Sequence, residues 1–582
     1  MSASKLIVDD RTNQQQALAS NPKTSVWVSA NAGSGKTTVL ARRVVRLLLN
    51  DTDPSRILCI TYTKAAAGEM ANKVFETLGD WAVIAESDLR EELSKIEQKA
   101  PTKAQLERAR TLFARALETP GGLKIQTIHA FCAQILRRFP VEAGVSPQFS
   151  EMDERQIAQL QTRIVEEIAA ESGENCFDAL AAELADEGSL PEILNGIQKH
   201  RVAVANGDRD RLADALGVDP ETDEHAINLA AMERIATSTL QMVHDAFERH
   251  GGKTENGLAP LLKTALQNIP VEAKFAVLEE VVLTKGRSPR STTNFPTASV
   301  KKAMPDALEI VIEIQEIVTD ARKQKFALQN FKRSETFNRF GQAFLERFEA
   351  IKSDQGLLDF DDLINRVRQL LADPSVADWV LYRLDEGIDH ILVDEAQDTS
   401  PTQWDVIKAL EAAFSDGVGA RSNIKRTLFV VGDKKQSIFG FQGADPDAFN
   451  DYRDHFEQRR ARVKQSLQVT SLNYSFRSAK PILELVDAVF ANPNLPALDD
   501  TVIHRSFPDK PGRVDLWEWK TKDAKADPPR WNAAVDQVLQ SDPVIALAGE
   551  MADHIADLVF NGAQMPGTLW CSSGPDHAFF IL

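Results

Sequence analysis

The stretch SANAGSGKTTVLARRVVRLLL, Ser29 to Leu49, constrains the fold of this chain more than any other segment. It joins a short apolar strand to a loop of small residues, and the loop to a helix with apolar residues on one face. A strand, a glycine-containing loop and a helix in this order are typical of a phosphate-binding loop, because backbone N–H groups and the helix N-terminus both face the loop. The sequence therefore predicts a nucleotide-binding domain.

One position of this loop departs from the phosphate-loop pattern G-x-x-x-x-G-K-[ST], because Ala30 stands where the first glycine is usual. The exchange costs little when the backbone φ angle there is negative, since only a positive φ requires glycine. Lys36 is expected to reach the outer phosphates and Thr37 to ligate Mg²⁺. A chance glycine turn is the alternative, which the strand–loop–helix context disfavours. The predicted nucleotide-binding loop comprises Ala30, Asn31, Ala32, Gly33, Ser34, Gly35, Lys36 and Thr37.

Several short apolar stretches are predicted strands, each followed by a turn or a helix. Strands that are apolar on both faces are typical of a parallel sheet covered by helices, so we predict an α/β fold. Between the third and fourth strands, residues 145–355 are rich in Ala, Glu, Leu and Arg at helical spacing and are predicted to form a helical insertion, with an exposed loop at 283–303. The predicted strands are 25–30, 56–63, 123–128, 390–395 and 427–433.

Length and composition bound the class of protein. A chain of 582 residues is too long for one core, so several domains are expected. No run of about 18 apolar residues occurs, and the start MSASKLIVDD has no apolar signal region, so we expect a cytoplasmic protein without a membrane partner. Four cysteines without C-x-x-C spacing argue against a zinc site or a disulfide framework. The formal charge of −18 counts only weakly against nucleic acid, because whole-chain charge says little about one groove.

Later strand ends carry residues suited to nucleotide hydrolysis. ILVDEAQD (391–398) supplies Asp394 to hold the metal and Glu395 to orient or deprotonate the attacking water. GDKKQSIFGFQGA (432–444) supplies Gln436, a neutral side chain able to contact both the γ-phosphate and that water. NYSFRSA (473–479) offers Arg477 as an arginine finger beside the ring of Phe476. An acidic pair or a lone arginine is commonplace at a surface, so it is their order after the loop that favours a site.

The chain resembles the UvrD/Rep-type superfamily 1 DNA helicases in an ordered set of segments: NQQQALA, ANAGSGKT, TYTKAAAGEM, TIHAFC, ILVDEAQDTSPTQ, VVGDKKQSIFGFQGA and NYSFRS. Within them it is most like the AddA/RecB branch of helicase–nuclease subunits, and the resemblance covers about residues 10 to 505. It implies a RecA-like motor that uses ATP and Mg²⁺ to move 3′ to 5′ along one DNA strand. It further implies double-strand break repair and recombination at DNA ends, with an AddB-like partner subunit.

The resemblance also implies a role for each matching residue. Gln16 would read adenine, although Gln14 and Gln15 leave the choice open, and Phe476 would stack on the same base. Glu395, Gln436 and Arg477 would be catalytic. Aromatic side chains would stack on single-strand bases, which gives affinity without sequence choice, although core packing is the alternative for each of them. The implied DNA-binding residues are Thr61, Tyr62, Thr63, Lys64, His129, Phe439 and Phe441.

By this resemblance, residues 1–144 and 356–466 form the first RecA-like motor domain, and 467–582 the opening part of a second. A strand is predicted at 512–519 and a helix near 543–561. The final stretch GTLWCSSGPDHAFFIL looks unlike the family, and no later motor motif or acidic nuclease cluster is found, so we expect a truncated or frame-shifted product without the C-terminal nuclease.

Three functions remain open at this point. The first is an ATP-dependent helicase of AddA type acting on single-stranded DNA and duplex ends. The second is a fragment that binds ATP and single-stranded DNA with little helicase activity. The third is a phosphate-loop ATPase that drives a conformational change in a partner rather than acting on DNA.

Overall fold

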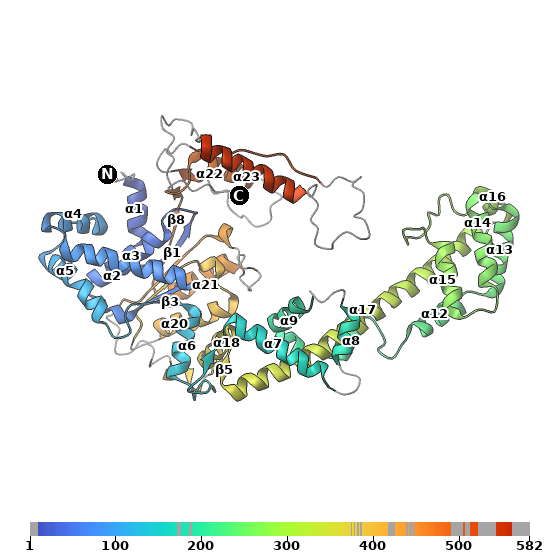
Figure 1. The fold of residues 1–582 in the computed structure, drawn as a ribbon, viewed down its shortest axis with the longest axis horizontal. Helices are drawn as coiled ribbons and strands as arrows, with labels where there is room; N and C mark the ends of the chain where they lie inside the picture. Colours follow the sequence, from blue (N-terminus) through green and yellow to red (C-terminus); the bar gives the residue numbers. More distant parts are fainter. Residues whose placement is uncertain are drawn as a thin grey trace. The chain divides into compact units, whose positions relative to one another are not determined.

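The chain forms two compact units, which are described separately. Unit 1 comprises Met1–Gln148 and Phe360–Leu582, and unit 2 comprises Phe149–Asp359 (Figure 1). The predicted α/β fold is confirmed by a parallel sheet with many helices in unit 1. The structure, a computed structural model, describes residues 10–171, 176–184, 189–373, 375–377, 379–380, 383, 387–416, 425–437, 440, 445, 448–490, 504–506, 512–521 and 543–561.

Unit 1 is built on a six-stranded parallel sheet in the order β3-β2-β6-β7-β1-β8. All five predicted strands are present, and the sixth strand, β8, pairs with β1 from Ser25 to Ala30. The predicted domain boundary after residue 466 would place β8 in a second motor domain, but the strand pairs with β1 in this sheet. The domain boundaries themselves stay a prediction. The strands are β1 (Ser25–Ala30), β2 (Ile57–Thr61), β3 (Lys124–Thr127), β6 (His390–Val393), β7 (Thr427–Gly432) and β8 (Leu467–Leu472).

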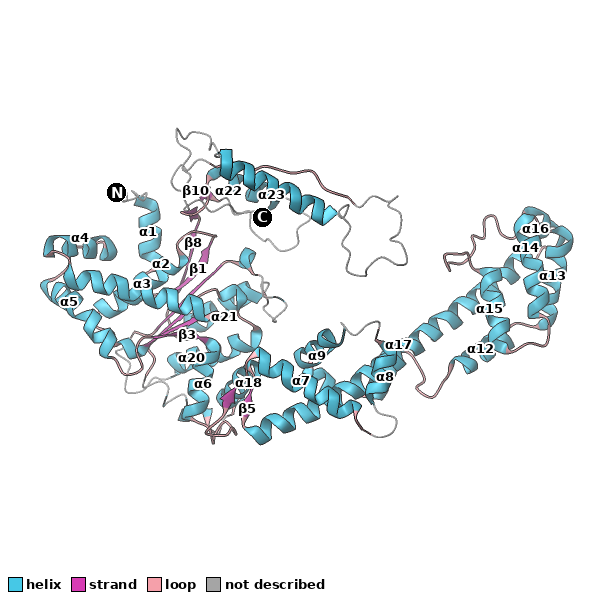
Figure 2. Cartoon of the chain, viewed as in Figure 1, coloured by secondary structure: helices cyan, strands magenta, loops and turns pink. Residues whose placement is uncertain are grey.

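Alternate side chains of β1 face two helical layers. Val26 and Val28 lie in one apolar core with residues of the helices that follow β1 and β2. Trp27 points the other way, where its ring lies 5.9 Å from Trp404 and 4.8 Å from Phe449. Burial on both faces explains why the strand is apolar throughout. The first layer contains α2 (Lys36–Leu49), α3 (Lys64–Val83), α4 (Glu86–Glu97) and α5 (Lys103–Glu118), and the second contains α20 (Pro401–Asp416) and α21 (Ala448–Arg462) (Figure 2).

A fully buried arginine fixes α2 against the start of β1. The guanidinium of Arg43 donates to the carbonyl oxygens of Asn21 and Thr24, both at 2.6 Å, and to Thr427 Oγ1 at 3.0 Å. It also lies over the ring of Phe429, 5.1 Å from the centroid. Both terminal nitrogens of the guanidinium are hydrogen-bonded, whereas the buried Nε has no partner among the described residues. This network holds the helix after the phosphate loop to the segment before β1 and to β7.

Shorter elements complete unit 1. The helix predicted near 543–561 is present, but the predicted strand at 512–519 is wrong, because residues 512–521 take no regular structure. The strand was predicted from its apolar residues, but these are not buried: Leu516, for example, is 97% exposed. The remaining elements are α1 (Asp10–Ala19), α6 (Ile128–Arg138), α18 (Phe360–Ala372), β9 (Tyr474–Ser475), α22 (Lys480–Phe490), β10 (Arg505–Ser506), α23 (Pro543–Asn561) and the 3₁₀ turns Pro54–Arg56, Ala396–Asp398 and Lys434–Gln436.

Unit 2 is a helical body organised along α17 (Ala307–Gln355), a helix of 49 residues (Figure 2). One apolar core joins the C-terminal half of α17 to α7, α8 and α9, and another joins its N-terminal half to α11 through α16. The other helices are α7 (Glu154–Ala169), α8 (Cys176–Glu183), α9 (Ser189–Lys199), α10 (Arg201–Ala205), α11 (Arg209–Leu216), α12 (Glu224–Glu233), α13 (Thr237–His250), α14 (Lys253–Ala265), α15 (Val271–Val282) and α16 (Ala298–Ala303).

The segment 283–303 differs from the exposed loop predicted for it. It ends in α16, and Phe295 and Val300 are buried in the core along α17. Polar and basic residues dominate the sequence there, so the two buried apolar residues give little signal. No helix among the described residues is both long enough and apolar enough to cross a membrane.

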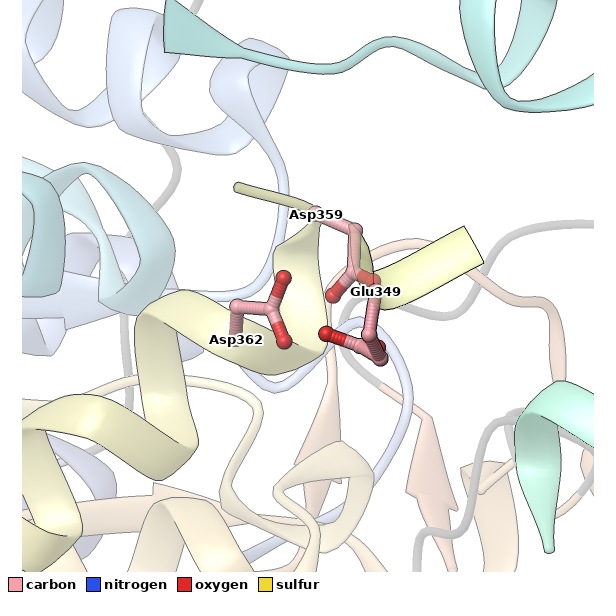
Figure 3. Close-up of side chains that lie close together, drawn as sticks. All are labelled: Glu349, Asp359 and Asp362. Atoms are coloured by element: carbon pink, nitrogen blue, oxygen red, sulfur yellow. The ribbon is translucent and has the colours of Figure 1, made fainter. Parts of the chain in front are cut away.

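The chain of unit 2 starts and ends side by side, because β4 (Ser150–Glu151) pairs in parallel with β5 (Leu357–Leu358). Near this pairing Lys352 is buried, with 2% exposure, and its ammonium lies 2.9 Å from Glu349 Oε1 and 2.8 Å from Asp359 Oδ2. Figure 3 draws these two carboxylates as sticks, together with that of Asp362. Glu349 and Asp359 compensate a buried cation, which accounts for their proximity to each other.

Candidate functional site

Apart from Gln16, which lies in α1 before β1, the predicted site residues of unit 1 lie at or after the carboxyl ends of its strands. Because the strands are all parallel, these ends share one edge of the sheet, where α/β proteins bind their ligands. The strands β6, β7, β1 and β8 are consecutive in the sheet. Their trailing loops therefore bring together the phosphate loop, the acidic pair, the turn with Gln436 and the segment with Arg477.

The phosphate loop has the backbone that its sequence predicts. Ala30 is the last residue of the extended strand β1, so the missing glycine costs nothing there. Gly33 and Gly35 have φ angles of 71° and 83°, in the left-handed region. No side chain caps α2 at Gly35, so the helix N-terminus is open to an anion. The buried Nδ2 of Asn31 and Oγ of Ser34 also have no hydrogen-bond partner, and the loop therefore fits a phosphate group.

Lys36 and Glu395 are brought together across the sheet edge. The Lys36 ammonium lies 2.7 Å from Glu395 Oε2, and the side chains are 10% and 34% exposed. Glu395 has a φ of 47°, a conformation that non-glycine residues adopt mainly where neighbouring structure holds them. Gln397 supplies part of that hold, because its Nε2 donates to the same carboxylate oxygen at 2.7 Å.

Asp394 is buried beside this pair. Its Oδ1 accepts from the backbone N–H of Glu395 at 3.0 Å, and the residue is 5% exposed. Burial, followed by the charge of Glu395, raises the pKa of Asp394 from 3.8 to about 6, although Lys36 partly opposes the shift. A carboxylate that is costly to ionise in the protein alone is suited to bind a cation, because the metal supplies the missing positive charge.

Replacing Asp394 with asparagine is expected to stabilise unit 1 in EDTA at pH 8. The folded pKa lies above the unfolded one, so the wild-type chain loses stability as pH rises from about 4 to 6 and bears the full penalty above that. Asparagine carries no charge and avoids this penalty, a gain of about 3 kcal/mol at pH 8. The gain should shrink to a small fraction near pH 4, where Asp394 is protonated in the folded state and about half protonated in the unfolded state.

Thermal unfolding of both chains in EDTA at the two pH values measures this effect. Asp433→Asn is the contrasting variant, because the Asp433 carboxylate accepts from Lys435 N at 3.2 Å and from Gln436 Nε2 at 2.5 Å. Its replacement should lower the melting temperature. A lower melting temperature for Asp394→Asn at pH 8 would contradict the prediction.

Gln397 links the acidic pair to the turn after β7, and sequence reasoning missed it. Besides donating to Glu395, its Oε1 accepts from the backbone N–H of Asp433 at 2.8 Å. The side chain passes directly over Gly432, where a Cβ atom would lie 2.7 Å from Gln397 Oε1. The close approach therefore requires glycine at that position. A single glutamine gives no signal in the sequence until β6 and β7 are known to be neighbours.

The turn after β7 carries Gln436 and two lysines. Gln436 donates to Asp433 Oδ2 within its own turn. Lys435 reaches the phosphate loop, where its ammonium lies 2.7 Å from Asn31 Oδ1. The structure therefore connects this turn to the loop through Lys435, which was not among the predicted site residues. The proposed role of Gln436 at the γ-phosphate stays a prediction.

The segment after β8 lies directly on the phosphate loop. The backbone N–H of Phe476 donates to the carbonyl of Gly33 at 2.8 Å, and that of Asn31 donates to the carbonyl of Leu472 at 3.1 Å. A Cβ atom on Gly33 would lie 2.7 Å from the Cβ of Arg477, so glycine is required here by space as well as by φ. Phe476 is half-buried and Arg477 is exposed. The finger and adenine-stacking roles of these residues stay predictions.

Gln16 is the one of three successive glutamines that lies at the loop. Gln14 is exposed and Gln15 half-buried, whereas Gln16 is buried, and its Nε2 would lie 3.7 Å from a Cβ on Gly35. Its Oε1 accepts from Arg42 at 3.4 Å. Of the three glutamines that the sequence left as candidates, the structure therefore favours Gln16. Its contact with adenine stays a prediction.

The predicted DNA-binding residues that the structure describes follow β2 and β3. Thr63 caps α3 by accepting from Ala66 N at 3.0 Å, and Lys64 is exposed. Burial, followed by the charge of Asp398, raises the pKa of the half-buried Tyr62 to about 12, so it stays a neutral ring. Thr61 is buried, which leaves its side chain away from the surface.

His129 is half-buried at the start of α6, with its ring centroid 5.2 Å from that of Phe360. Phe439 and Phe441 lie outside the described residues. Tyr62 after β2 and His129 after β3 thus place aromatic rings at the carboxyl edge of the sheet. Their contact with DNA stays a prediction. Among the described cysteines, Cys59 and Cys132 are buried thiols and Cys176 is half-buried.

Comparison with known proteins agrees with this arrangement. Residues 11–457 match the family model of the UvrD/REP helicase N-terminal domain. Proteins whose names describe them as subunits of an ATP-dependent helicase/nuclease are similar to the chain over 82% of its length: that of Enterococcus faecalis is 28% identical over 516 residues, that of Lactobacillus acidophilus 26% over 530 and that of Clostridium novyi 26% over 519. The chain spans 38 to 40% of their length. Because the family model covers most of the chain, including every strand of the sheet except β8, the chain belongs to the UvrD/REP helicase family.

Proposed function

We propose that this chain is the motor part of an ATP-dependent DNA helicase of AddA type. The observation that carries the proposal is the meeting of four loops at one sheet edge, in which Lys36 pairs with Glu395 at 2.7 Å and Phe476 N–H bonds to Gly33 at 2.8 Å. A simple phosphate-binding fold needs only the first loop. An acid, a turn linked to it and an arginine-bearing segment together suit hydrolysis that is coupled to movement.

In the proposed reaction the chain's own residues bind, orient and activate. The open N-terminus of α2 and Lys36 would bind the phosphates, Thr37 and Asp394 would hold Mg²⁺, and Gln16 would orient adenine. The bound Mg²⁺ would neutralise charge on the outer phosphates. Glu395 would accept a proton from the attacking water, which requires that Lys36 release its carboxylate to bind phosphate instead.

The proposal extends to DNA and to partners through the resemblance and the names of the relatives. Tyr62, Phe439 and Phe441 would stack on single-strand bases, and Thr63, Lys64 and His129 would contact the backbone or bases nearby, whereas Thr61 is buried and is not part of the proposal. Movement would run 3′ to 5′, in the processing of DNA ends for double-strand break repair. An AddB-like subunit would be the partner, and the complex would act in the cytoplasm.

Single-stranded DNA is expected to stimulate ATP hydrolysis by the 582-residue chain, and the combined variant Tyr62→Ala, Phe439→Ala, Phe441→Ala is expected to lose that stimulation. Each lost stacking contact is worth roughly 1–3 kcal/mol, so removal of three should lower DNA affinity by about a hundredfold or more. Steady-state phosphate release, titrated with an oligothymidylate, measures both quantities.

Phe326→Ala is the matched control, because Phe326 is an exposed aromatic residue in unit 2, 53% exposed, and should leave the DNA response unchanged. An ATP hydrolysis rate that does not change when DNA is added would favour the alternative function, a phosphate-loop ATPase that acts on a protein partner. Unwinding of a 3′-tailed duplex, compared with a 5′-tailed one, tests the proposed direction.

A further inference from the structure

Lys435 places the ammonium of a half-buried side chain against the phosphate loop. It belongs to the turn after β7, and its side chain is 12% exposed. The nearest acceptor is Asn31 Oδ1 at 2.7 Å, in the loop itself. A lysine so far from water is uncommon unless an anion compensates its charge.

Among the described residues, Lys435 makes one long ion pair. The nearest carboxylate oxygen, Asp433 Oδ1, is 3.9 Å from the ammonium, and Asp433 already accepts from Lys435 N and Gln436 Nε2. Burial lowers the pKa of Lys435, and the charges of Asp433 and Asp487 oppose that shift. Within the part of the chain that the structure describes, the ammonium has one neutral acceptor at hydrogen-bond distance, Asn31 Oδ1, and one carboxylate at 3.9 Å. A lysine ammonium has three donors, so Lys435 can still donate to a further anion.

A second observation points in the same direction. Asn31 is buried, 4% exposed, and its Nδ2 has no hydrogen-bond partner, like the Oγ of Ser34 further along the loop. Unpartnered buried donors are costly, so they indicate a ligand that accepts hydrogen bonds. These donors belong to the same loop that the Lys435 ammonium contacts.

The position of the turn indicates which part of the ligand Lys435 would meet. Gln397 connects the turn to Glu395 by donating to the Glu395 carboxylate and accepting from Asp433 N–H. Glu395 is the proposed base, so the turn lies on the side of the nucleotide where hydrolysis takes place. The phosphate group on that side is the γ-phosphate.

We propose that Lys435 is a second phosphate-binding cation of this site, which contacts the γ-phosphate and makes the site prefer a nucleoside triphosphate to a diphosphate. This assignment rests on the proposed function. The two lysines would then act differently. Lys36 would bind phosphate only after its ion pair with Glu395 breaks, whereas Lys435 is already oriented by its hydrogen bond to Asn31. Loss of the γ-phosphate would then leave the Lys435 charge uncompensated and favour release of the product.

The alternative role for Lys435 is a strut that only ties the turn to the loop. Lys435→Gln separates the two roles, because glutamine can still donate to Asn31 but carries no charge. Asn31→Ala is the reverse change, because it removes the acceptor and keeps the ammonium. Lys435→Arg keeps the charge with a different shape and serves as the conservative rescue.

The experiment measures binding of mant-ATPγS and mant-ADP to the full 582-residue chain with Mg²⁺. We expect Lys435→Gln to weaken mant-ATPγS binding by about 10- to 100-fold, as for a lost charged hydrogen bond, and mant-ADP binding by less than about twofold. Asn31→Ala should affect both nucleotides equally, and Lys435→Arg should retain the triphosphate preference. Melting temperatures within a few degrees of wild type establish that the variants are folded.

The assignment is overturned if Lys435→Gln affects both nucleotides equally or affects neither. It is also overturned if the triphosphate preference is lost in Asn31→Ala but kept when residue 435 carries no charge. The wild type and Lys36→Ala keep this result separate from the function itself. If the wild type binds mant-ATPγS, Lys36→Ala loses it and Lys435→Gln retains the preference, only the role of Lys435 is wrong. If the wild type binds neither nucleotide, the proposed function fails and the assignment with it.

Discussion

Replacing Glu395 with glutamine is expected to reduce the rate of ATP hydrolysis by about 10²- to 10⁴-fold while ATP binding persists. Glutamine has the same shape and can keep hydrogen bonds to Lys36 and Gln397, which lie 2.7 Å from the carboxylate. It cannot accept a proton from water at neutral pH. The change therefore removes the proposed base and leaves the architecture around it.

Phosphate release at saturating ATP, with and without single-stranded DNA, measures the rate, and mant-ATP fluorescence measures binding. Glu118→Gln is the matched control, because Glu118 is an exposed acid at the end of α5 and should leave both values unchanged. A variant that retains more than half of the wild-type rate would show that Glu395 is not the base.

Replacing Lys36 with alanine is expected to weaken ATP binding by about 10- to 100-fold and to abolish measurable hydrolysis. The variant removes a charged donor to phosphate, and hydrogen bonds to charged groups contribute about 1.5–3 kcal/mol. The open N-terminus of α2 remains, so some affinity for phosphate should survive. Glu395 would keep its bond from Gln397 and lose its cation.

Isothermal titration with ATPγS in the presence of Mg²⁺ measures the loss of affinity. Lys103→Ala controls for the loss of a lysine, because the Lys103 side chain is 91% exposed on α5. Wild-type affinity in Lys36→Ala would place the phosphates elsewhere. The two variants differ in kind, since Glu395→Gln should trap bound ATP and Lys36→Ala should fail to hold it.

Much of the nucleotide edge could be predicted from the sequence, because its parts are local. The loop from Ala30 to Lys36 is marked by glycines at fixed spacing before a helix, and Asp394 and Glu395 by their place at the end of an apolar strand. Strands apolar on both faces were correctly expected to form a parallel sheet. The order of strands in that sheet, with β6 and β7 between β2 and β1, carries no such local signal.

The residues that sequence reasoning missed depend on that strand order. Gln397 matters because β6 and β7 are neighbours, and Lys435 because β7 lies beside β1. Asn31 and Lys435 are 404 positions apart in the chain, so their contact cannot be read from local sequence. The strand β8 was missed for a different reason: it lies at the edge of the sheet, only its first and last residues, Leu467 and Leu472, are buried, and its apolar pattern is therefore weak.

The segment from Leu472 to Phe476 is held to the phosphate loop at both of its ends, by Asn31 N–H and by the Gly33 carbonyl. Its length is therefore part of the site. One inserted or deleted residue between these two bonds would shift Arg477 along the loop and turn its side chain away, even if every side chain of the site were kept. Sequences of this type should consequently vary in residue identity across that span while keeping its residue count constant, so a gap there would mark a chain that has lost the site.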